Sequence, residues 1–272
     1  MSEETWFTNE RIRYIINIGL FVLAILPLVF PFNLPLKIGR TTEMYYNTVE
    51  ELNPDELVIF YFAEGTAQWG EMGPPGIAQL QQLVNKGVNI IVVCGTIESP
   101  GLFDANLKPA IDWKDYVYGE DWLNIGYYPG GESFITSLAT EPHSAFVVDA
   151  DGTSLDSLPL WADYQTGEDA VLIIGNEPSS GIIFMRQFQV KWNTPLVWAA
   201  PSAVYTSSLS YLESDQLKGL LNSLRGGAEL EKLINKPGRG LSAMDALSAI
   251  HVWVILLTIA GNIQYLRGRM NK

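Results

Sequence analysis

The stretch LVIFYFAEGTAQWGEMGPPGIAQLQQLVNKGVNIIVV, residues 57–93, decides the fold. It opens and closes with continuous apolar runs of strand length, residues 57–62 and 88–93, as expected for strands that are covered on both faces. Between them, apolar residues recur at helical spacing, which predicts a helix over 75–85 that proline starts and Gly87 stops. This is a β-α-β unit, whose strands pair in parallel through a right-handed crossover.

The same alternation continues outward from this unit. Further strands are predicted at 122–126, 145–148, 170–174 and 196–199, and helices at 41–52, 132–138 and 181–192. Residues 209–234 carry leucines at helical spacing and predict two helices separated by Gly226-Gly227. Strands that alternate with helices predict an α/β domain with a Rossmann-like open, mostly parallel sheet.

Two hydrophobic segments, about 15–32 and 246–266, bracket this domain, and each is close to the ~20 residues that cross a bilayer. The first segment ends without the small-residue pattern of a cleaved signal peptide, which favours an anchor. The predicted organisation is therefore a cytoplasmic N-terminal segment 1–14, a transmembrane helix 15–35, an extracytoplasmic α/β domain 36–243, a second transmembrane helix 244–266, and a cytoplasmic tail 267–272.

The orientation follows from the basic residues in the short flanks. Arg11 and Arg13 precede the first segment, and Arg267, Arg269 and Lys272 follow the second. Because Lys and Arg gather on the cytoplasmic side, we expect a two-pass protein of the plasma membrane with both termini in the cytoplasm and the domain outside.

Charge is distributed unevenly along the chain, whose net charge is −13. Residues 41–180 hold 22 acidic side chains against three basic ones. Such a surface repels nucleic acid phosphates, so no nucleic acid partner is expected. The two hydrophobic segments make the lipid bilayer an expected partner, together with other membrane subunits or copies of the same chain. One cysteine cannot form an internal disulfide.

Ligands of open α/β sheets bind beyond the carboxyl ends of the strands, so the loops there are the first candidate site. These loops are rich in glycine and small residues, which let a ligand approach the backbone closely. The candidate ligand-binding residues are Glu64, Gly65, Gly130, Gly131, Glu132, Asn176, Ser179 and Ser180. No loop matches a nucleotide-binding glycine pattern, and no cofactor is expected.

Two further patterns suggest function but also have a purely structural explanation. Cys94 follows a strand, which is a position that a nucleophile can take. Its base could only be His143, the one histidine outside the hydrophobic segments. The alternative is a buried, unreactive cysteine. Asp149, Asp151 and Asp156 resemble part of a calcium loop, and an Asp-Gly turn explains them equally well.

Polar residues within the hydrophobic segments indicate contacts between helices, because a polar group in lipid needs a partner. The candidate packing residues are Asn17, His251, Thr258, Gly261 and Asn262. Packing of the two segments on each other would satisfy them, and association with other subunits is the alternative.

Several short motifs support a resemblance that spans most of the chain. They are Leu36-Lys37-Ile38, Asn124-Ile125-Gly126-Tyr127 with Pro129-Gly130-Gly131, and Gly219-Leu220-Leu221 with Arg225-Gly226-Gly227-Ala228-Glu229. The arrangement resembles prokaryotic membrane proteins with an anchor, a Rossmann-like domain and a second anchor. The domain is also distantly similar to the amidotransferase-like domain of auxiliary proteins in gliding-motility ABC transporters. That resemblance implies a domain that commonly lacks catalytic residues.

Three functions follow as hypotheses. The leading one is a non-catalytic, membrane-anchored subunit or scaffold of a larger membrane assembly. The alternative is a membrane-anchored sensor domain that binds a small ligand or a metal. The third is an amidotransferase-like enzyme that works through Cys94.

Overall fold

The computed structural model describes residues 9–177 and 181–270. The chain divides into two compact units. One is Lys37–Gly240, and the other joins the two terminal segments, up to Leu36 and from Leu241.

The first unit is built on six parallel strands in the order β3-β2-β1-β4-β5-β6. The strands are β1 (Leu57–Phe62), β2 (Asn89–Cys94), β3 (Trp122–Tyr127), β4 (Leu172–Asn176), β5 (Leu196–Ala200) and β6 (Gly219–Asn222). Every residue of β1 is buried, as its uninterrupted apolar run predicts for a central strand. The predicted Rossmann-like open sheet is confirmed.

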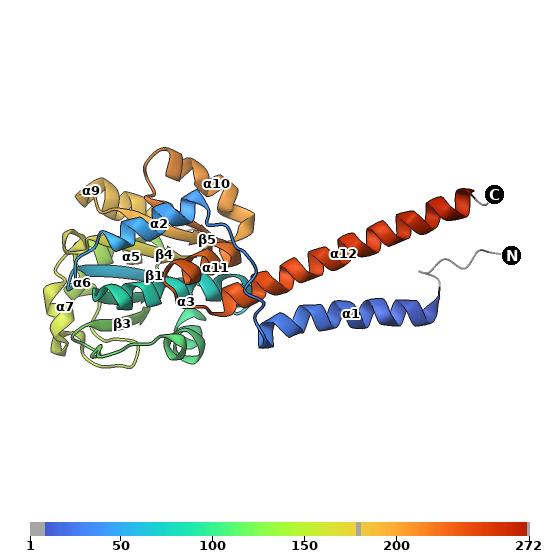
Figure 1. The fold of residues 1–272 in the computed structure, drawn as a ribbon. Coiled ribbons are helices and arrows are strands. Elements are labelled where there is room, and N and C mark those ends of the chain that lie inside the picture. Colours follow the sequence, from blue (N-terminus) through green and yellow to red (C-terminus); the bar gives the residue numbers. More distant parts are fainter. Residues whose placement is uncertain (1–8, 178–180, 271–272) are drawn as a thin grey trace. The chain divides into compact units, whose positions relative to one another are not determined.

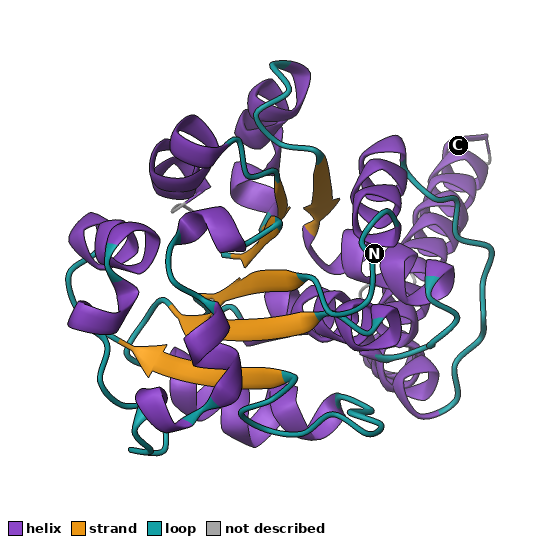
Figure 2. Ribbon diagram, turned by 90° about the vertical axis from the view of Figure 1, so that its left-hand side faces the viewer, coloured by secondary structure: helices purple, strands orange, loops and turns teal. Residues whose placement is uncertain are grey.

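Helices cover both faces of this sheet (Figures 1 and 2). Side chains of β1 alternate between two cores, with Phe60 on one face and Ile59 on the other. The Phe60 face is covered by α2 (Arg40–Glu50), α3 (Trp69–Lys86), α11 (Ser223–Leu233), and the short turns α4 (Ser99–Leu102), η2 (Phe103–Leu107) and η3 (Lys108–Ala110). The Ile59 face is covered by α5 (Glu132–Thr140), α6 (Pro142–Ala145), η4 (Leu155–Ser157), α7 (Pro159–Asp163), η5 (Gly167–Asp169), α8 (Gly181–Phe184), η6 (Met185–Gln189), α9 (Val190–Trp192) and α10 (Ser202–Glu213).

The strand predicted at 145–148 is wrong. Ala145 ends helix α6, and Val148 makes a single antiparallel bridge to Ser154 across a turn. Val147 and Val148 are 65% and 41% exposed. An apolar pair that is open to solvent lacks the cover on both faces that a central parallel strand needs.

The helix break predicted at Gly226-Gly227 is also wrong, because both glycines lie inside α11. The unpredicted strand β6 separates α10 from α11 instead. A Cβ atom on Gly227 would stand 2.7 Å from the backbone nitrogen of Pro75, so this glycine lets α11 lie directly against α3.

Helix α3 begins at Trp69, earlier than the predicted start at Pro75. Pro74 and Pro75 lie within it. Proline has a helical φ, but it lacks an N–H donor and its ring crowds the carbonyl four residues earlier, so the turn before the prolines needs other support. The amide of Met72 donates to the carbonyl of Gln68 at 2.8 Å, and the Trp69 ring lies against Gly73.

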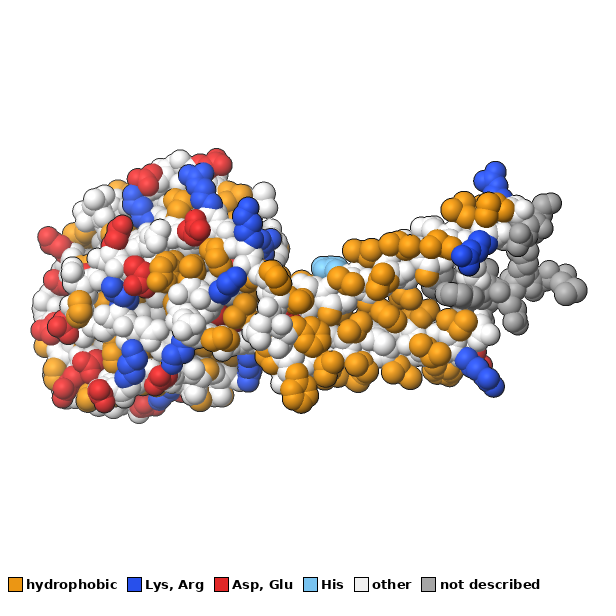
Figure 3. All heavy atoms as spheres, in the orientation of Figure 1, with side chains coloured by type: hydrophobic (Ala, Val, Ile, Leu, Met, Phe, Trp, Pro, Cys, Tyr) orange, Lys and Arg blue, Asp and Glu red, His pale blue; other side chains and the backbone are white. Residues whose placement is uncertain are grey.

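The second unit contains α1 (Glu10–Val29) and α12 (Arg239–Met270), of which the first two residues belong to the first unit. Both helices are long and apolar enough to cross a membrane. Hydrophobic side chains cover most of their visible surface (Figure 3). Gly19 lies against Trp253, and the Asp245 carboxylate accepts hydrogen bonds from the amides of Asn33 and Leu34 at 2.8 and 3.0 Å.

Candidate functional site

β1 and β4 are neighbours in the sheet. From β1 the chain adds β2 and β3 on one side, and it then crosses back to add β4, β5 and β6 on the other side, so the strand order reverses between β1 and β4. Phe62 pairs with Asn176, so the segments that leave these strands start side by side. In open α/β sheets, ligands bind in the crevice that forms at this switch point. The sheet therefore brings Glu64 next to Asn176 and Glu177.

Glu64 is the chemically unusual residue of this site. Its side chain is 0% exposed, and neither carboxyl oxygen has a hydrogen-bond partner among the described residues. Burial, and to a lesser degree the nearby carboxylates of Glu177 and Glu71, together raise the pKa of Glu64 to about 8. At neutral pH the Glu64 carboxyl is therefore mostly protonated and neutral.

Glu71 supplies a fixed negative charge nearby. Its Oε1 accepts hydrogen bonds from the amide of Ser202 at 2.8 Å and from the hydroxyl of Ser223 at 2.6 Å. These bonds, that of Ser223 first, lower the pKa of Glu71 below its usual value. The carboxylate thus ties α3 to the first residues of α10 and α11, and it stays ionised at neutral pH.

Asn176 and Glu177 complete the site from β4. The amide nitrogen of Asn176 donates to the carbonyl of Met72 at 3.1 Å, while its Oδ1 has no partner in the described part of the chain. A Cβ atom on Gly76 would collide with this amide. Glu177 accepts a hydrogen bond from the amide of Gly181 at 3.1 Å. Glu64 and Asn176 have three oxygens without a partner among the described residues, so a hydrogen-bond donor suits them once Glu64 has lost its proton.

The structure gathers part of the predicted ligand-binding set and separates the rest. Glu64, Gly65 and Asn176 meet at the β1–β4 switch point. Gly130 and Gly131 follow β3, two strands away, and have positive φ angles of 140° and 55° where the chain turns into α5.

Glu132, which follows these glycines, forms a two-pronged ion pair with Arg186 at 3.0 and 2.7 Å. This exposed pair belongs to the contact between α5 and η6. Ser179 and Ser180 lie outside the described residues. Sequence reasoning missed Glu71, because the predicted start of the helix at Pro75 left that residue in a loop.

The loop after β1 is held in place by its neighbours. The carboxylate of Glu98 accepts hydrogen bonds from the amide and the hydroxyl of Thr66, both at 2.6 Å. The amide of Gly65 donates to Gln68 at 3.1 Å. The backbone that carries Glu64 is thus fixed before any ligand binds.

Cys94 does not have the surroundings of a nucleophile. It is fully buried in the apolar core on the α3 face, and burial raises the pKa of its thiol well above the usual range. His143 lies at the opposite face of the sheet, where its Nε2 is 2.9 Å from the carbonyl oxygen of Tyr164. A cysteine nucleophile needs an accessible thiol beside a base, and Cys94 and His143 do not meet this condition.

Asp149 is the centre of a turn. Its Oδ1 accepts hydrogen bonds from the amides of Asp151 and Thr153, and its Oδ2 accepts one from the hydroxyl of Tyr118. Asp156 lies 3.7 Å from His143 instead. Among the described residues, no group of three or more His, Cys, Asp or Glu side chains is arranged to hold a metal ion.

The predicted packing residues of the hydrophobic helices lie at the surface of this monomer. Asn17, His251, Thr258 and Asn262 are exposed, and Gly261 is half-buried. Thr258 donates to the carbonyl of Val254 in its own helix at 2.8 Å. The two helices contact each other through other residues, such as Gly19 and Trp253.

Comparison with known protein families finds no match, and comparisons with curated proteins and with solved structures find none at a significant level. What is shared with the two-anchor membrane proteins is the architecture: a parallel sheet with an apolar helix near each end of the chain. The similarity to the amidotransferase-like domain gains no support beyond that architecture.

Proposed function

We propose that the chain is a membrane-anchored binding domain whose ligand presents an ammonium or amidinium group to Glu64. The observation that carries the proposal is the fully buried Glu64 carboxyl at the switch point of the sheet, whose two oxygens have no partner in the described part of the chain. A buried polar group without a partner costs about 1–3 kcal/mol, so such a group is kept where it serves a ligand.

The charges of the site favour a cationic ligand. Glu71 is ionised, and no described ion pair places a lysine or arginine against Glu64 or Glu71. When an ammonium group enters, the attraction lowers the pKa of Glu64, and the carboxyl loses its proton. Binding is therefore coupled to the release of about one proton, and affinity rises with pH up to about 8.

The test is a thermal unfolding series on the full chain in detergent, with putrescine, agmatine and magnesium ion as probes at pH 6.5 and 8.0. A ligand at a hundred times its dissociation constant adds about 2.7 kcal/mol of stability. We expect an amine to raise the melting temperature more at pH 8.0, and Glu64→Gln to remove the effect.

Glu120→Gln is the matched control, because Glu120 is an exposed carboxylate on the same unit. It should respond to the amine as the parent protein does. The proposal fails if no amine shifts the transition, if magnesium alone does, or if the Glu64→Gln protein keeps the full shift.

In this proposal, α1 and α12 span the plasma membrane and hold the domain outside the cell, with both termini in the cytoplasm. The supports are the length and apolar character of both helices and the basic residues at the terminal ends, Arg11, Arg13, Arg267 and Arg269.

A second candidate function is that of a subunit in a larger membrane assembly, and the polar residues of α12 favour it. Thr258 and Asn262 follow His251 by seven and eleven residues, so all three lie on one face of the helix. All three are exposed, and a polar stripe of this kind in lipid bonds to a neighbouring helix.

Blue-native electrophoresis of gently solubilised membranes tests this candidate. The parent protein should migrate above its monomer mass, and the double variant His251→Leu/Asn262→Leu should migrate closer to it. Val252→Leu, at an exposed apolar position of the same helix, is the control. A monomer-sized band for the parent protein, under conditions that preserve known complexes, would remove this candidate.

A further inference from the structure

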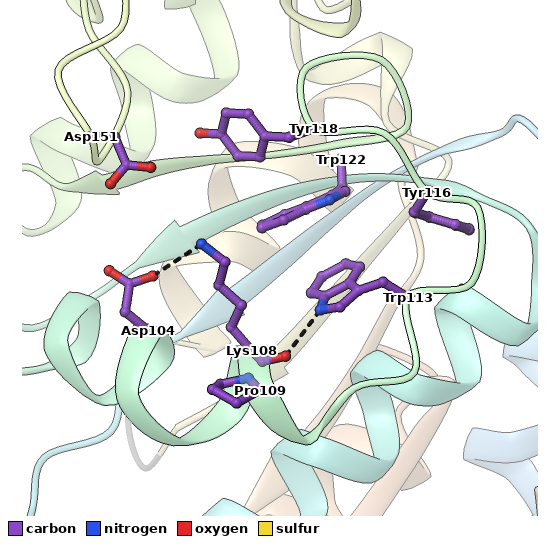
Figure 4. Close-up of a pocket in the computed structure, with 8 residues that line it drawn as sticks. All are labelled: Asp104, Lys108, Pro109, Trp113, Tyr116, Tyr118, Trp122 and Asp151. Atoms are coloured by element: carbon purple, nitrogen blue, oxygen red, sulfur yellow. Dashed lines mark hydrogen bonds and ion pairs between the residues drawn. The ribbon is translucent and has the colours of Figure 1, made fainter.

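A cavity of about 550 Å³ lies at an edge of the sheet, beside β3, which is two strands away from β1 (Figure 4). It is lined by aromatic rings and charged side chains. The six lining residues that matter for its chemistry are Asp104, Lys108, Trp113, Tyr118, Trp122 and Asp151.

The aromatic rings form a rigid wall. Trp113 stacks on Trp122 with ring centroids 4.1 Å apart and an interplanar angle of 20°, and Tyr118 meets Trp122 edge-on at 4.8 Å. Hydrogen bonds fix two of these rings: the indole N–H of Trp113 donates to the carbonyl of Lys108 at 3.0 Å, and the Tyr118 hydroxyl donates to Asp149 at 2.7 Å. Trp113 and Tyr118 are half-buried, so parts of their rings remain accessible.

Charges of both signs border this wall. The Lys108 ammonium lies 5.5 Å from the ring centroid of Trp122 and 3.7 Å from an Asp104 oxygen. Asp151 faces it from the other side of the cavity, on the turn whose backbone is bound to Asp149 (Figure 4). The opening therefore offers a strong hydrogen-bond donor and two carboxylate acceptors beside aromatic rings.

This combination selects the class of ligand. A cationic ligand would have to displace Lys108, which already occupies the aromatic face, and an anionic ligand would meet Asp104 and Asp151. A neutral hydroxyl group both donates to carboxylates and accepts from an ammonium group. The C–H faces of a sugar ring can also pack against the electron-rich faces of aromatic rings.

We propose that this cavity binds a neutral saccharide, with Trp113 and Tyr118 as the stacking surface and Lys108, Asp104 and Asp151 as hydrogen-bonding groups for its hydroxyls. The volume lies within the range of small-ligand sites, about 300–1,000 Å³. The site is independent of Glu64, and the two can be tested separately.

Isothermal titration of the detergent-solubilised full chain tests the proposal, with maltose, cellobiose and N,N′-diacetylchitobiose as probes and with choline and glucuronate as charged comparisons. At least one disaccharide should bind saturably. Asp151→Ala should weaken that binding about tenfold or more without a change in melting temperature, because Asp151 is exposed and its side chain takes part in no hydrogen bond to the described residues.

Asp163→Asn is the matched control, since Asp163 is an exposed carboxylate outside the cavity, and it should bind the sugar as the parent protein does. Glu64→Gln should also leave sugar binding unchanged. The proposal is overturned if no disaccharide binds, if Asp151→Ala binds as well as the parent protein, or if choline or glucuronate binds more tightly than every sugar.

Discussion

At the scale of single residues, Glu64 links the stability of the α/β domain to pH. Its pKa is about 8 in the folded chain and near the ordinary 4.5 in the unfolded chain, so between these values the folded state holds a proton that the unfolded state has lost. Stability should therefore fall as pH rises from about 4.5 to about 8, by up to about 1.4 kcal/mol per pH unit from this group.

Glu64→Gln should remove this dependence, because the amide stays neutral. Melting temperatures of the full chain between pH 5 and 8.5 check it: the Gln variant and the parent should be similar near pH 5, and the variant should be more stable at pH 8. Glu120→Gln should follow the parent protein at every pH. Parallel curves for the parent and Glu64→Gln would show that Glu64 is ionised in the folded state.

The sequence was enough to select Glu64 as a candidate residue, but not to predict its protonation state. A loop after a buried strand is predictable from the apolar run 57–62, and its position beyond the strand end marks it as a candidate. The raised pKa of its carboxyl depends on burial and on the charges of Glu177 and Glu71, which come from other segments of the chain. Because residues from three separate segments determine this protonation state, the sequence around Glu64 alone cannot predict it.

At the scale of elements, the contact between α3 and α11 depends on glycine. Alanine is normally better than glycine inside a helix by about 0.5–1 kcal/mol. At Gly227, however, the added Cβ would stand 2.7 Å from the Pro75 nitrogen and 2.9 Å from its Cα, so the helices must move apart. We expect Gly227→Ala to destabilise the domain by about 1–3 kcal/mol.

Gly70→Ala is the matched control, since Gly70 lies in α3 and an added Cβ meets nothing within 4 Å. It should leave stability unchanged or raise it. Thermal or urea unfolding of the two variants, measured side by side, separates helix propensity from packing. A Gly227→Ala protein as stable as Gly70→Ala would contradict the close contact.

Helix α11 also holds both ends of the α/β unit through buried carboxylates. Glu229 accepts hydrogen bonds from the amide of Gly39 at 2.9 Å and the hydroxyl of Thr42 at 2.6 Å, where α2 begins. Glu231 accepts from the amides of Gly238 and Gly240 at 3.1 and 2.8 Å, where α12 begins. These carboxylates meet the unsatisfied N–H groups of two helix starts.

Glu229→Ala and Glu231→Ala should each lower the free energy of unfolding by about 1–3 kcal/mol, because each leaves buried donors unpaired. Glu213→Ala, at an exposed position of α10, should change it by about 0.5 kcal/mol or less. Proteolysis within residues 37–40 or 236–240 should accelerate in the first two variants alone. Unfolding and cleavage rates like those of Glu213→Ala would show that the junctions are held by other contacts.

Elements differed in how far sequence could predict them. The strands β1 and β2 follow from apolar runs that burial on both faces requires, and the structure places them within one residue of the prediction. Strand β6 has four residues, and its neighbouring leucines fit a helix equally well. The glycine pair in α11 allows close helix packing, and this role can be recognised only when the contact with α3 is known.

At the scale of the whole molecule, function depends on the compartment that the α/β unit faces. If the α/β unit lies outside the cell, the proposed amine and saccharide sites are exposed to external solutes. If it lies in the cytoplasm, the same sites are exposed to cytoplasmic metabolites. Arg11 and Arg13 precede α1's apolar segment, and Arg267 and Arg269 follow that of α12, so the positive-inside bias predicts an external domain.

The single natural cysteine makes this orientation measurable. Cys94 is 0% exposed and has a raised pKa, so it should react slowly with a membrane-impermeant maleimide and give little background. A cysteine introduced as Asp163→Cys lies at an exposed position of the α/β unit, and a second variant carries a cysteine appended after Lys272. Intact cells, or spheroplasts where an outer membrane is present, should label the Asp163→Cys protein and should label the appended cysteine only after lysis. The reverse pattern would place the domain in the cytoplasm, and the ligands proposed for its two sites would then have to come from inside the cell.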